Sequence, residues 1–127
     1  DQVTHYNGTI REKPESEAEA RAYLKSYETA PACTVSSVVI TDLATGTQVD
    51  GVDIARQWFK PIPTEIVDQL LAKGDVYHCC GGFLIDDPLI EPYLDKREGD
   101  EDSIIGLPMR LVNSLLEQLQ QQLATTP

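Results

Sequence analysis

Basic residues are scarce in this 127-residue chain. It has 10 lysines and arginines against 21 aspartates and glutamates, so its formal net charge is −11 at pH 7. Such a surface repels nucleic acid, because binding to a phosphate backbone depends on lysine and arginine. We therefore expect no nucleic-acid partner. A small polyanionic ligand would need a local cationic pocket or a divalent metal ion.

Long apolar runs are also lacking. Hydrophobic residues make up 41% of the chain, which is ordinary for a globular protein. No run is long enough to span a bilayer, and no signal-peptide pattern is recognisable. The length suits one domain with its own core. We expect a single domain over residues 1–127 and no membrane partner.

Cysteines are few, and their spacing pairs none of them. The three are Cys33, Cys79 and Cys80, an odd number without the spacing of a metal-binding or redox motif. Reduced thiols in a cytoplasmic location are the simplest interpretation. A nucleophilic cysteine would need a base and a lowered pKa, and the sequence indicates neither.

The first fourteen residues carry the clearest structural signal. Asn7-Gly8 predicts a β-hairpin, because both residues accept positive φ. This hairpin would bring Asp1 and Lys13 close together. The Asp1 carboxylate could hold a cation or accept a proton from water, and the Lys13 ammonium could neutralise a phosphate oxygen. An exposed ion pair at a strand end is the plainer alternative.

The rest of the chain predicts a mixture of helices and strands. Capping and periodicity signals predict helices over about 15–28, after Thr64 until Gly74, and from Pro108 to a fraying tail. Strands are expected over 33–43, from 47 and over 53–60, and a short one in the stretch 75–85 ahead of Gly81-Gly82, with a charged loop at 96–102. Because these elements do not alternate as clean βαβ units, we expect an α/β fold with a mixed sheet flanked by helices.

The stretch 75–85 also draws attention to its glycines. Gly81-Gly82 indicates a close backbone approach, either to a ligand or to another strand. His78 is expected to be packed or hydrogen-bonded in a strand, and the cysteines after it to be buried small apolar residues. Asp86-Asp87-Pro88 predicts a turn, with Asp86 as the capping candidate.

A set of short stretches then points to one family. They are Asp1-Gln2-Val3, Asn7-Gly8, Lys13-Pro14, Val38-Val39-Ile40-Thr41, Trp58-Phe59, Ile62-Pro63, His78-Cys79-Cys80-Gly81-Gly82-Phe83 and Gly106-Leu107-Pro108. Each motif is weak by itself, but the ordered set spans nearly the whole chain. It resembles the Maf nucleotide pyrophosphatases, also called septum-formation-inhibitor-like proteins.

The resemblance implies a Maf/inosine-triphosphatase-like fold and a hydrolase that cuts nucleoside triphosphates between the α- and β-phosphates. The products would be a nucleoside monophosphate and pyrophosphate. Asp1 would be the proton acceptor or a metal-associated carboxylate, with Mg or Mn as the divalent cation. Lys13 would contact phosphate, and Gln2 and Asp86 would take part in base choice. A homodimer is compatible with this reading.

The chain also departs from the family pattern. Family members carry a Ser-x-x-Arg phosphate loop, then a glutamate and a lysine, ahead of the aspartate that corresponds to Asp1. None of this is in residues 1–127. We therefore expect a C-terminal portion that lacks the N-terminal part and is a poor enzyme alone. A non-catalytic acidic interaction domain with the same fold is the alternative.

The triplet at Asp1 and the His-Cys-x-Gly run resemble the subgroup that prefers 7-methylguanosine triphosphate. Guanine presents N1–H and an exocyclic amine as adjacent donors, and a carboxylate such as Asp86 can accept from both. Asp86 is one methylene shorter than the glutamate usual in that subgroup. A pyrimidine (dTTP/UTP) pyrophosphatase is the other enzyme reading. Uracil and thymine offer one donor between two acceptors, which an acid would repel.

Overall fold

One five-stranded β-sheet organises the structure, a computed structural model that describes residues 2–125. The strand order is β2-β1-β3-β4-β5, and every neighbouring pair is antiparallel. The strands are β1 (Gln2–Tyr6), β2 (Thr9–Arg11), β3 (Ala32–Thr41), β4 (Gln48–Phe59) and β5 (Leu94–Glu98). The α/β class with a sheet flanked by helices is confirmed, but the sheet is antiparallel where a mixed one was expected.

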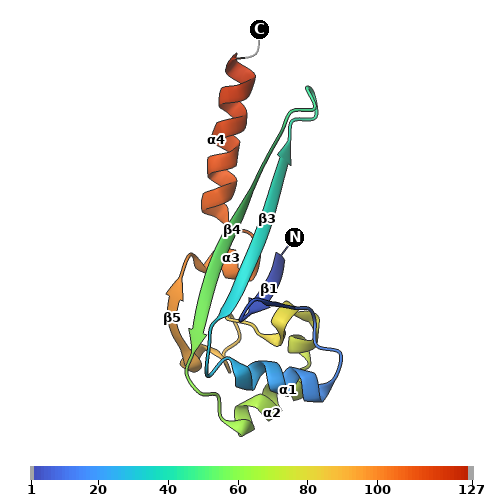
Figure 1. The fold of residues 1–127 in the computed structure, drawn as a ribbon, viewed down its shortest axis with the longest axis vertical. Helices are drawn as coiled ribbons and strands as arrows, with labels where there is room; N and C mark the ends of the chain where they lie inside the picture. Colours follow the sequence, from blue (N-terminus) through green and yellow to red (C-terminus); the bar gives the residue numbers. More distant parts are fainter. Residues whose placement is uncertain (1, 126–127) are drawn as a thin grey trace.

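The helices lie at both ends of this sheet and, in the case of the short third helix, beside its middle (Figure 1). They are α1 (Glu17–Ser26), α2 (Thr64–Lys73), α3 (Glu101–Ile105) and α4 (Met109–Thr125), with short 3₁₀ segments η1 (Asp75–His78), η2 (Cys80–Gly82) and η3 (Glu91–Tyr93). Figure 1 shows α1 and α2 at one end, while α4 runs along the β3–β4 hairpin at the other. None of the helices in residues 2–125 is long and apolar enough to cross a membrane.

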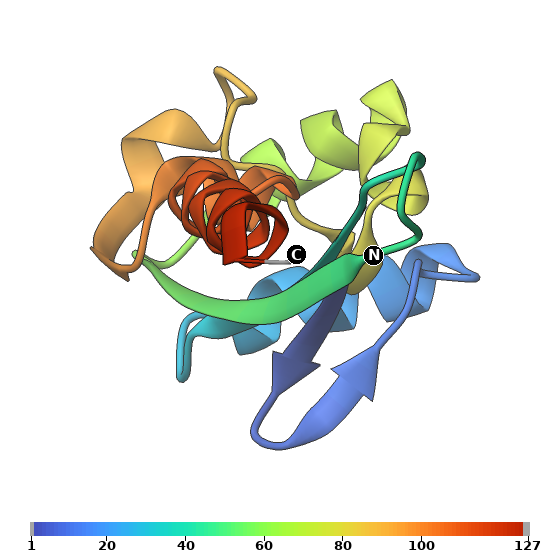
Figure 2. The same cartoon turned by 90° about the horizontal axis from the view of Figure 1, so that it is seen from above.

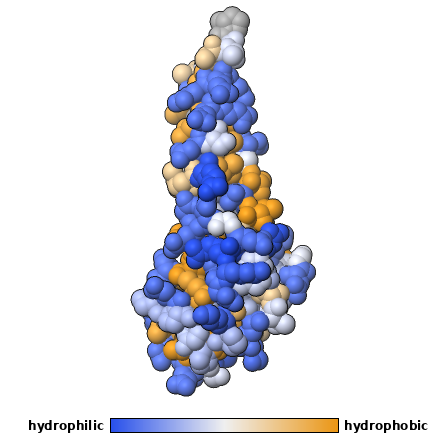
Figure 3. Space-filling view, turned by 90° about the vertical axis from the view of Figure 1, so that its left-hand side faces the viewer, coloured by the Kyte–Doolittle hydropathy of each residue, from blue (hydrophilic) through white to orange (hydrophobic). Residues whose placement is uncertain are grey.

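The β3–β4 hairpin is longer than its neighbours. Strand β4 pairs with the whole of β3, whereas β1 pairs only with its Cys33–Ser36 part. Helix α4 packs on this extension, with its Leu115 and Leu119 against Val49 of β4. Figure 2 shows the helix against one face of the hairpin. Val39 and Val52 remain exposed on the opposite face. Figure 3 shows the extension as a narrow arm with apolar surface between hydrophilic side chains.

The main core lies at the other end of the sheet, under α1 and α2. Tyr27, Phe59 and Phe83 contact one another there, with ring centroids 5.5–5.7 Å apart. All three side chains are buried. They come from the end of α1, the end of β4 and the segment after η2, so this cluster connects the sheet to the segment 75–85.

The structure corrects several of the helices, strands and loops predicted from the sequence. The short strand expected before Gly81 does not form, since Asp75–His78 and Cys80–Gly82 are 3₁₀ segments. Gly81 (φ 75°) and Gly82 (φ 67°) then adopt positive φ, which turns the chain out of an extended course. The expected loop at 96–102 instead supplies most of β5 and the start of α3. The two runs from 47 and 53 form the single strand β4. The expected fraying tail is helical to Thr125.

Candidate functional site

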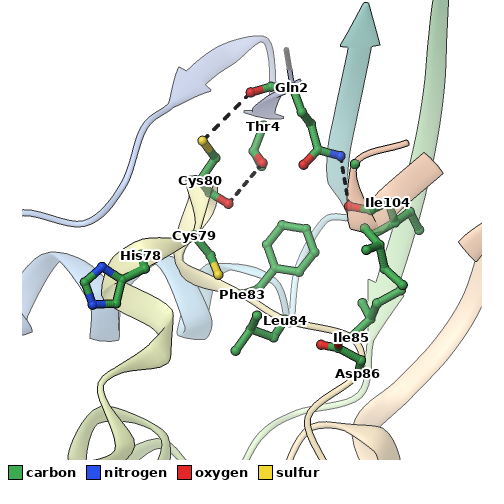
Figure 4. A pocket seen from close by; sticks show the side chains of 12 residues that line it. Gln2, Thr4, His78, Cys79, Cys80, Phe83, Leu84, Ile85, Asp86 and Ile104 are labelled. Atoms are coloured by element: carbon green, nitrogen blue, oxygen red, sulfur yellow. Dashed lines mark hydrogen bonds between the residues drawn. The ribbon is translucent and has the colours of Figure 1, made fainter. Parts of the chain in front are cut away.

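A cavity of about 400 Å³ opens beside the start of β1. Three segments far apart in the sequence line it: β1 with Gln2 and Thr4, the stretch 78–86, and Ile104 to Gly106 at the end of α3. Apolar side chains form most of the walls, and Figure 4 shows Phe83, Leu84 and Ile85 among them. A mostly apolar cavity of this size with a few polar groups is typical of small-molecule sites.

Three hydrogen bonds hold the backbone at Cys80 and Gly81, beside the cavity. Thr4 Oγ1 donates to the Cys80 carbonyl (3.1 Å), and the Tyr27 hydroxyl donates to the Gly81 carbonyl (2.6 Å). The Gly81 N–H donates to the carbonyl of Glu12, in the segment after β2 (3.1 Å). Burial raises the pKa of Tyr27 to about 12, so this phenol remains a donor at neutral pH.

Gln2 lies at the top of the cavity, with its amide held in one orientation. Its Nε2 donates to the carbonyls of Ser103 and Ile104, both at 2.8 Å. It also contacts Ser36 Oγ at 3.3 Å. Figure 4 shows the amide oxygen on the side away from Ile104, toward the cavity. Among residues 2–125 nothing donates to this oxygen, so Gln2 presents a hydrogen-bond acceptor to a ligand.

The two neighbouring aspartates have different positions. Asp86 is exposed and lines the cavity. Asp87 is buried, and its carboxylate accepts from Lys73 Nζ and from the Leu89 N–H, both at 2.8 Å. Burial alone would raise the pKa of Asp87, but these donors outweigh it and the pKa is lowered. The expectation that Asp86 caps the turn is therefore wrong, and Asp87 has that role.

Lys13 lies next to the same cavity. It lines a shallow groove together with Cys80, which also lines the main cavity. The Lys13 ammonium is close enough to oppose the rise in the pKa of Cys79. Among the described residues no carboxylate pairs with it. Arg11 is engaged elsewhere, because it stacks 4.0 Å over the Tyr6 ring and donates to Ser26 Oγ.

The structure thus brings Gln2 and Asp86 to one cavity and Lys13 to the adjoining groove, while Asp1 lies outside the described residues. A comparison with protein families matches residues 1–119 to the family described as Maf-like protein. The chain belongs to the Maf-like family.

Its relatives are named as pyrophosphatases. The chain is 46% identical to a 7-methyl-GTP pyrophosphatase of Dictyostelium discoideum, over 95% of this chain and 60% of the relative. It is 23% identical to a dTTP/UTP pyrophosphatase of Methanosarcina barkeri, over 92% of this chain and 59% of the relative. A nucleoside triphosphate pyrophosphatase/Nudix hydrolase fusion protein of Bifidobacterium longum is 31% identical, over 84% of this chain and 22% of the relative. The chain spans about 60% of the length of the first two relatives.

Cys79 is not an activated nucleophile in this Maf-like cavity. Burial raises the pKa of the Cys79 thiol, and the carboxylates of Asp75 and Asp86 raise it further. The thiol is therefore protonated at neutral pH and a weak nucleophile. His78 is exposed, and Figure 4 shows its ring directed away from the cavity, so the expected packed strand histidine is wrong. Cys79 and Cys80 are half-buried rather than fully buried.

Within residues 2–125 no three His, Cys, Asp or Glu side chains are arranged to hold a metal ion. Among the described residues that line the cavity, Asp86 supplies the single carboxylate. One such ligand is too few for Mg²⁺ or Mn²⁺. The described residues by themselves do not fit a metal site.

Sequence reasoning missed Ser103 and Asp53. Ser103 is completely buried, and its hydroxyl donates to Asp53 on β4. The sequence placed Ser103 only at the approach to the last helix and Asp53 at the start of a strand. Nothing in either local pattern marks them, because they meet through tertiary packing of α3 on the sheet.

Proposed function

We propose that this Maf-like protein is a nucleoside triphosphate pyrophosphatase whose preferred substrate is 7-methylguanosine triphosphate. It would hydrolyse the bond between the α- and β-phosphates and release the monophosphate and pyrophosphate. One observation carries the proposal: the amide oxygen of Gln2 and the carboxylate of Asp86 face one apolar cavity, with Lys13 beside it. The 46% identical relative that is named a 7-methyl-GTP pyrophosphatase supports it.

The cavity suits a guanine base. Apolar side chains such as Phe83 and Ile85 offer surfaces to the faces of a ring. The Gln2 oxygen would accept from the N1–H, and the Asp86 carboxylate from the exocyclic amine. Methylation at N7 adds positive charge to the ring, which the Asp86 carboxylate favours. The sequence suggested the Asp86 carboxylate as the acceptor for both guanine donors. The structure adds a second acceptor, the amide oxygen of Gln2.

The triphosphate would extend from the cavity toward Lys13. The ammonium would neutralise phosphate oxygens, and Asp1 would accept the proton of the attacking water. In a chain of net charge −11, a divalent cation such as Mg²⁺ or Mn²⁺ would accompany the substrate and reduce its repulsion.

The three cysteines, which are all free, support a reducing cytoplasmic location. A homodimer stays a prediction.

A pyrimidine nucleotide is the second candidate substrate. More distant relatives are named dTTP/UTP pyrophosphatases. The N3–H of uracil or thymine would also satisfy the Gln2 oxygen, and Asp86 would then have no donor to accept from.

A pyrophosphate-release screen distinguishes these readings. The whole protein, with any residues that flank this chain, is given 7-methyl-GTP, GTP, ATP, dTTP and UTP with Mg²⁺ or Mn²⁺. We expect kcat/KM for 7-methyl-GTP to exceed the others by about tenfold or more, as the difference of one charged hydrogen bond allows. A preference for dTTP or UTP would support the pyrimidine reading. If no nucleotide releases pyrophosphate, the alternative of a non-catalytic acidic interaction domain is supported.

Replacing Asp86 by asparagine should lower kcat/KM for 7-methyl-GTP by about tenfold or more and spare dTTP and UTP, because a charged acceptor is lost. The control is Asp75→Asn. Asp75 is also exposed and also influences the Cys79 thiol, yet it does not line the cavity. An Asp86→Asn protein with unchanged selectivity, or an equal effect in the control, would contradict the role of Asp86.

A further inference from the structure

A row of polar side chains crosses the sheet behind the cavity. Gln2 on β1 lies directly opposite Ser36 on β3, and Ser36 lies directly opposite Asp53 on β4. Residues directly opposite one another in a sheet have side chains on the same face. These three side chains therefore point to one side of the sheet, toward Ser103 of α3.

Ser103 connects the row. Its hydroxyl donates to Asp53 Oδ2, and its carbonyl accepts from Ser36 Oγ at 3.3 Å and from Gln2 Nε2 at 2.8 Å. Ser36 and Ser103 are essentially inaccessible to solvent, at 1% and 0% exposure. A buried polar cluster with its partners satisfied specifies one arrangement, because each alternative leaves a group unpaired.

The amide orientation of Gln2 follows from this arrangement. The carbonyls of Ser103 and Ile104 can only accept, so the side of the amide that faces them must be the NH₂ group. A flipped amide would place its oxygen against both carbonyl oxygens and lose both bonds. The fixed amide leaves its oxygen toward the cavity, as Figure 4 shows.

Helix α3 needs help to hold these carbonyls in place. It has only 5 residues, and a helix this short is not stable by its own hydrogen bonds. The buried side chain of Ile104 attaches it to the main core. The bond from Ser103 to Asp53 additionally attaches it to β4, on the same turn that supplies the two carbonyls to Gln2.

We propose that Ser103 and Asp53 are positioning residues that orient the Gln2 amide and so make the cavity select bases with an N–H donor on the edge that meets Gln2. Guanine, 7-methylguanine and hypoxanthine have such a donor at N1, and uracil and thymine have one at N3. Adenine and cytosine present an acceptor at these positions and are rejected by the amide oxygen. This selection rests on the proposed function.

The experiment measures kcat and KM for GTP and for ATP with the whole protein and Mg²⁺. The variants are Ser103→Ala, Asp53→Ala and Asp53→Asn, with the exposed Ser114→Ala on α4 as the matched serine control. Unfolding midpoints are recorded for each protein. Asp53→Asn keeps an oxygen that can accept from Ser103, so it serves as the conservative variant.

We expect the wild type to prefer GTP. This preference should fall at least fivefold in Ser103→Ala and Asp53→Ala, mainly through KM, with kcat for GTP within twofold of wild type. Asp53→Asn and Ser114→Ala should keep the wild-type ratio. Three outcomes overturn the inference: a wild type without preference for GTP, an unchanged ratio in both alanine variants, or equal losses on GTP and ATP that follow the unfolding midpoint. A wild type that hydrolyses no nucleotide overturns the proposed function, and the inference with it.

Discussion

Replacement of Asp1 by asparagine should lower kcat by about 10²-fold or more in the whole protein, the range expected for loss of a general base. An amide neither accepts a proton at neutral pH nor carries the charge that would attract a cation. Asp1 immediately precedes Gln2, which lies at the cavity. Initial rates of pyrophosphate release at saturating substrate measure the effect.

The control for Asp1→Asn is Asp50→Asn, which makes the same change at an exposed position of β4 outside the cavity lining. Both variants should keep the wild-type unfolding midpoint. Near-normal turnover of Asp1→Asn would rule out the catalytic role of this carboxylate. Equal losses in the two variants would assign the effect to overall charge.

Replacement of Gly81 by alanine should give the largest loss of stability, about 2–5 kcal/mol in the free energy of unfolding. Gly81 has φ 75°, where a side chain costs about 1–2 kcal/mol. A Cβ there would also lie 2.6 Å from Thr4 Cγ2 and 2.8 Å from the Tyr27 hydroxyl oxygen. Both neighbours are buried, and such overpacking costs a further 1–3 kcal/mol or so. Urea titration measures the change.

Gly46→Ala separates the backbone cost from the steric cost. Gly46 has the same φ of 75°, but nothing lies within 4 Å of a Cβ built on it. It should therefore lose only about 1–2 kcal/mol. Equal losses at the two positions would show that the contacts with Thr4 and Tyr27 add nothing.

The position of Gly81 also connects stability with the proposed site. Its neighbour Cys80 lines both the cavity and the groove of Lys13. The Gly81 N–H donates to the carbonyl of Glu12, the residue before Lys13. This turn thus connects the backbone beside the cavity to the segment that carries Lys13.

Sequence alone determined those elements whose cause is local. Asn7 (φ 49°) and Gly8 (φ 82°) make the expected hairpin turn, because each residue accepts positive φ by itself. Ser16 accepts from the Glu19 N–H at the start of α1, as the capping signal predicts. Interactions between residues within one or two turns of chain need no knowledge of the fold.

Elements that depend on distant partners could not be predicted in this way. The charged stretch 94–98 is a strand because β4 pairs with it, and Arg97 donates to the buried Gln57 (2.6 Å). The stretch around Gly81 has strand-like composition, but Tyr27 and Thr4 hold it in a tight turn from 54 and 76 positions away. Composition describes the residues of a segment and not the partners that satisfy its backbone.

The candidate site divides in the same manner. Motifs in the sequence named Asp1, Lys13, Gln2 and Asp86, because the kinds of residue and their order along the chain are features of the family. Only the tertiary structure decided that Asp86 rather than Asp87 faces the cavity, since Lys73 binds the other carboxylate. It also decided which atom of Gln2 meets a ligand, because the carbonyls that orient the amide lie 101 and 102 residues away.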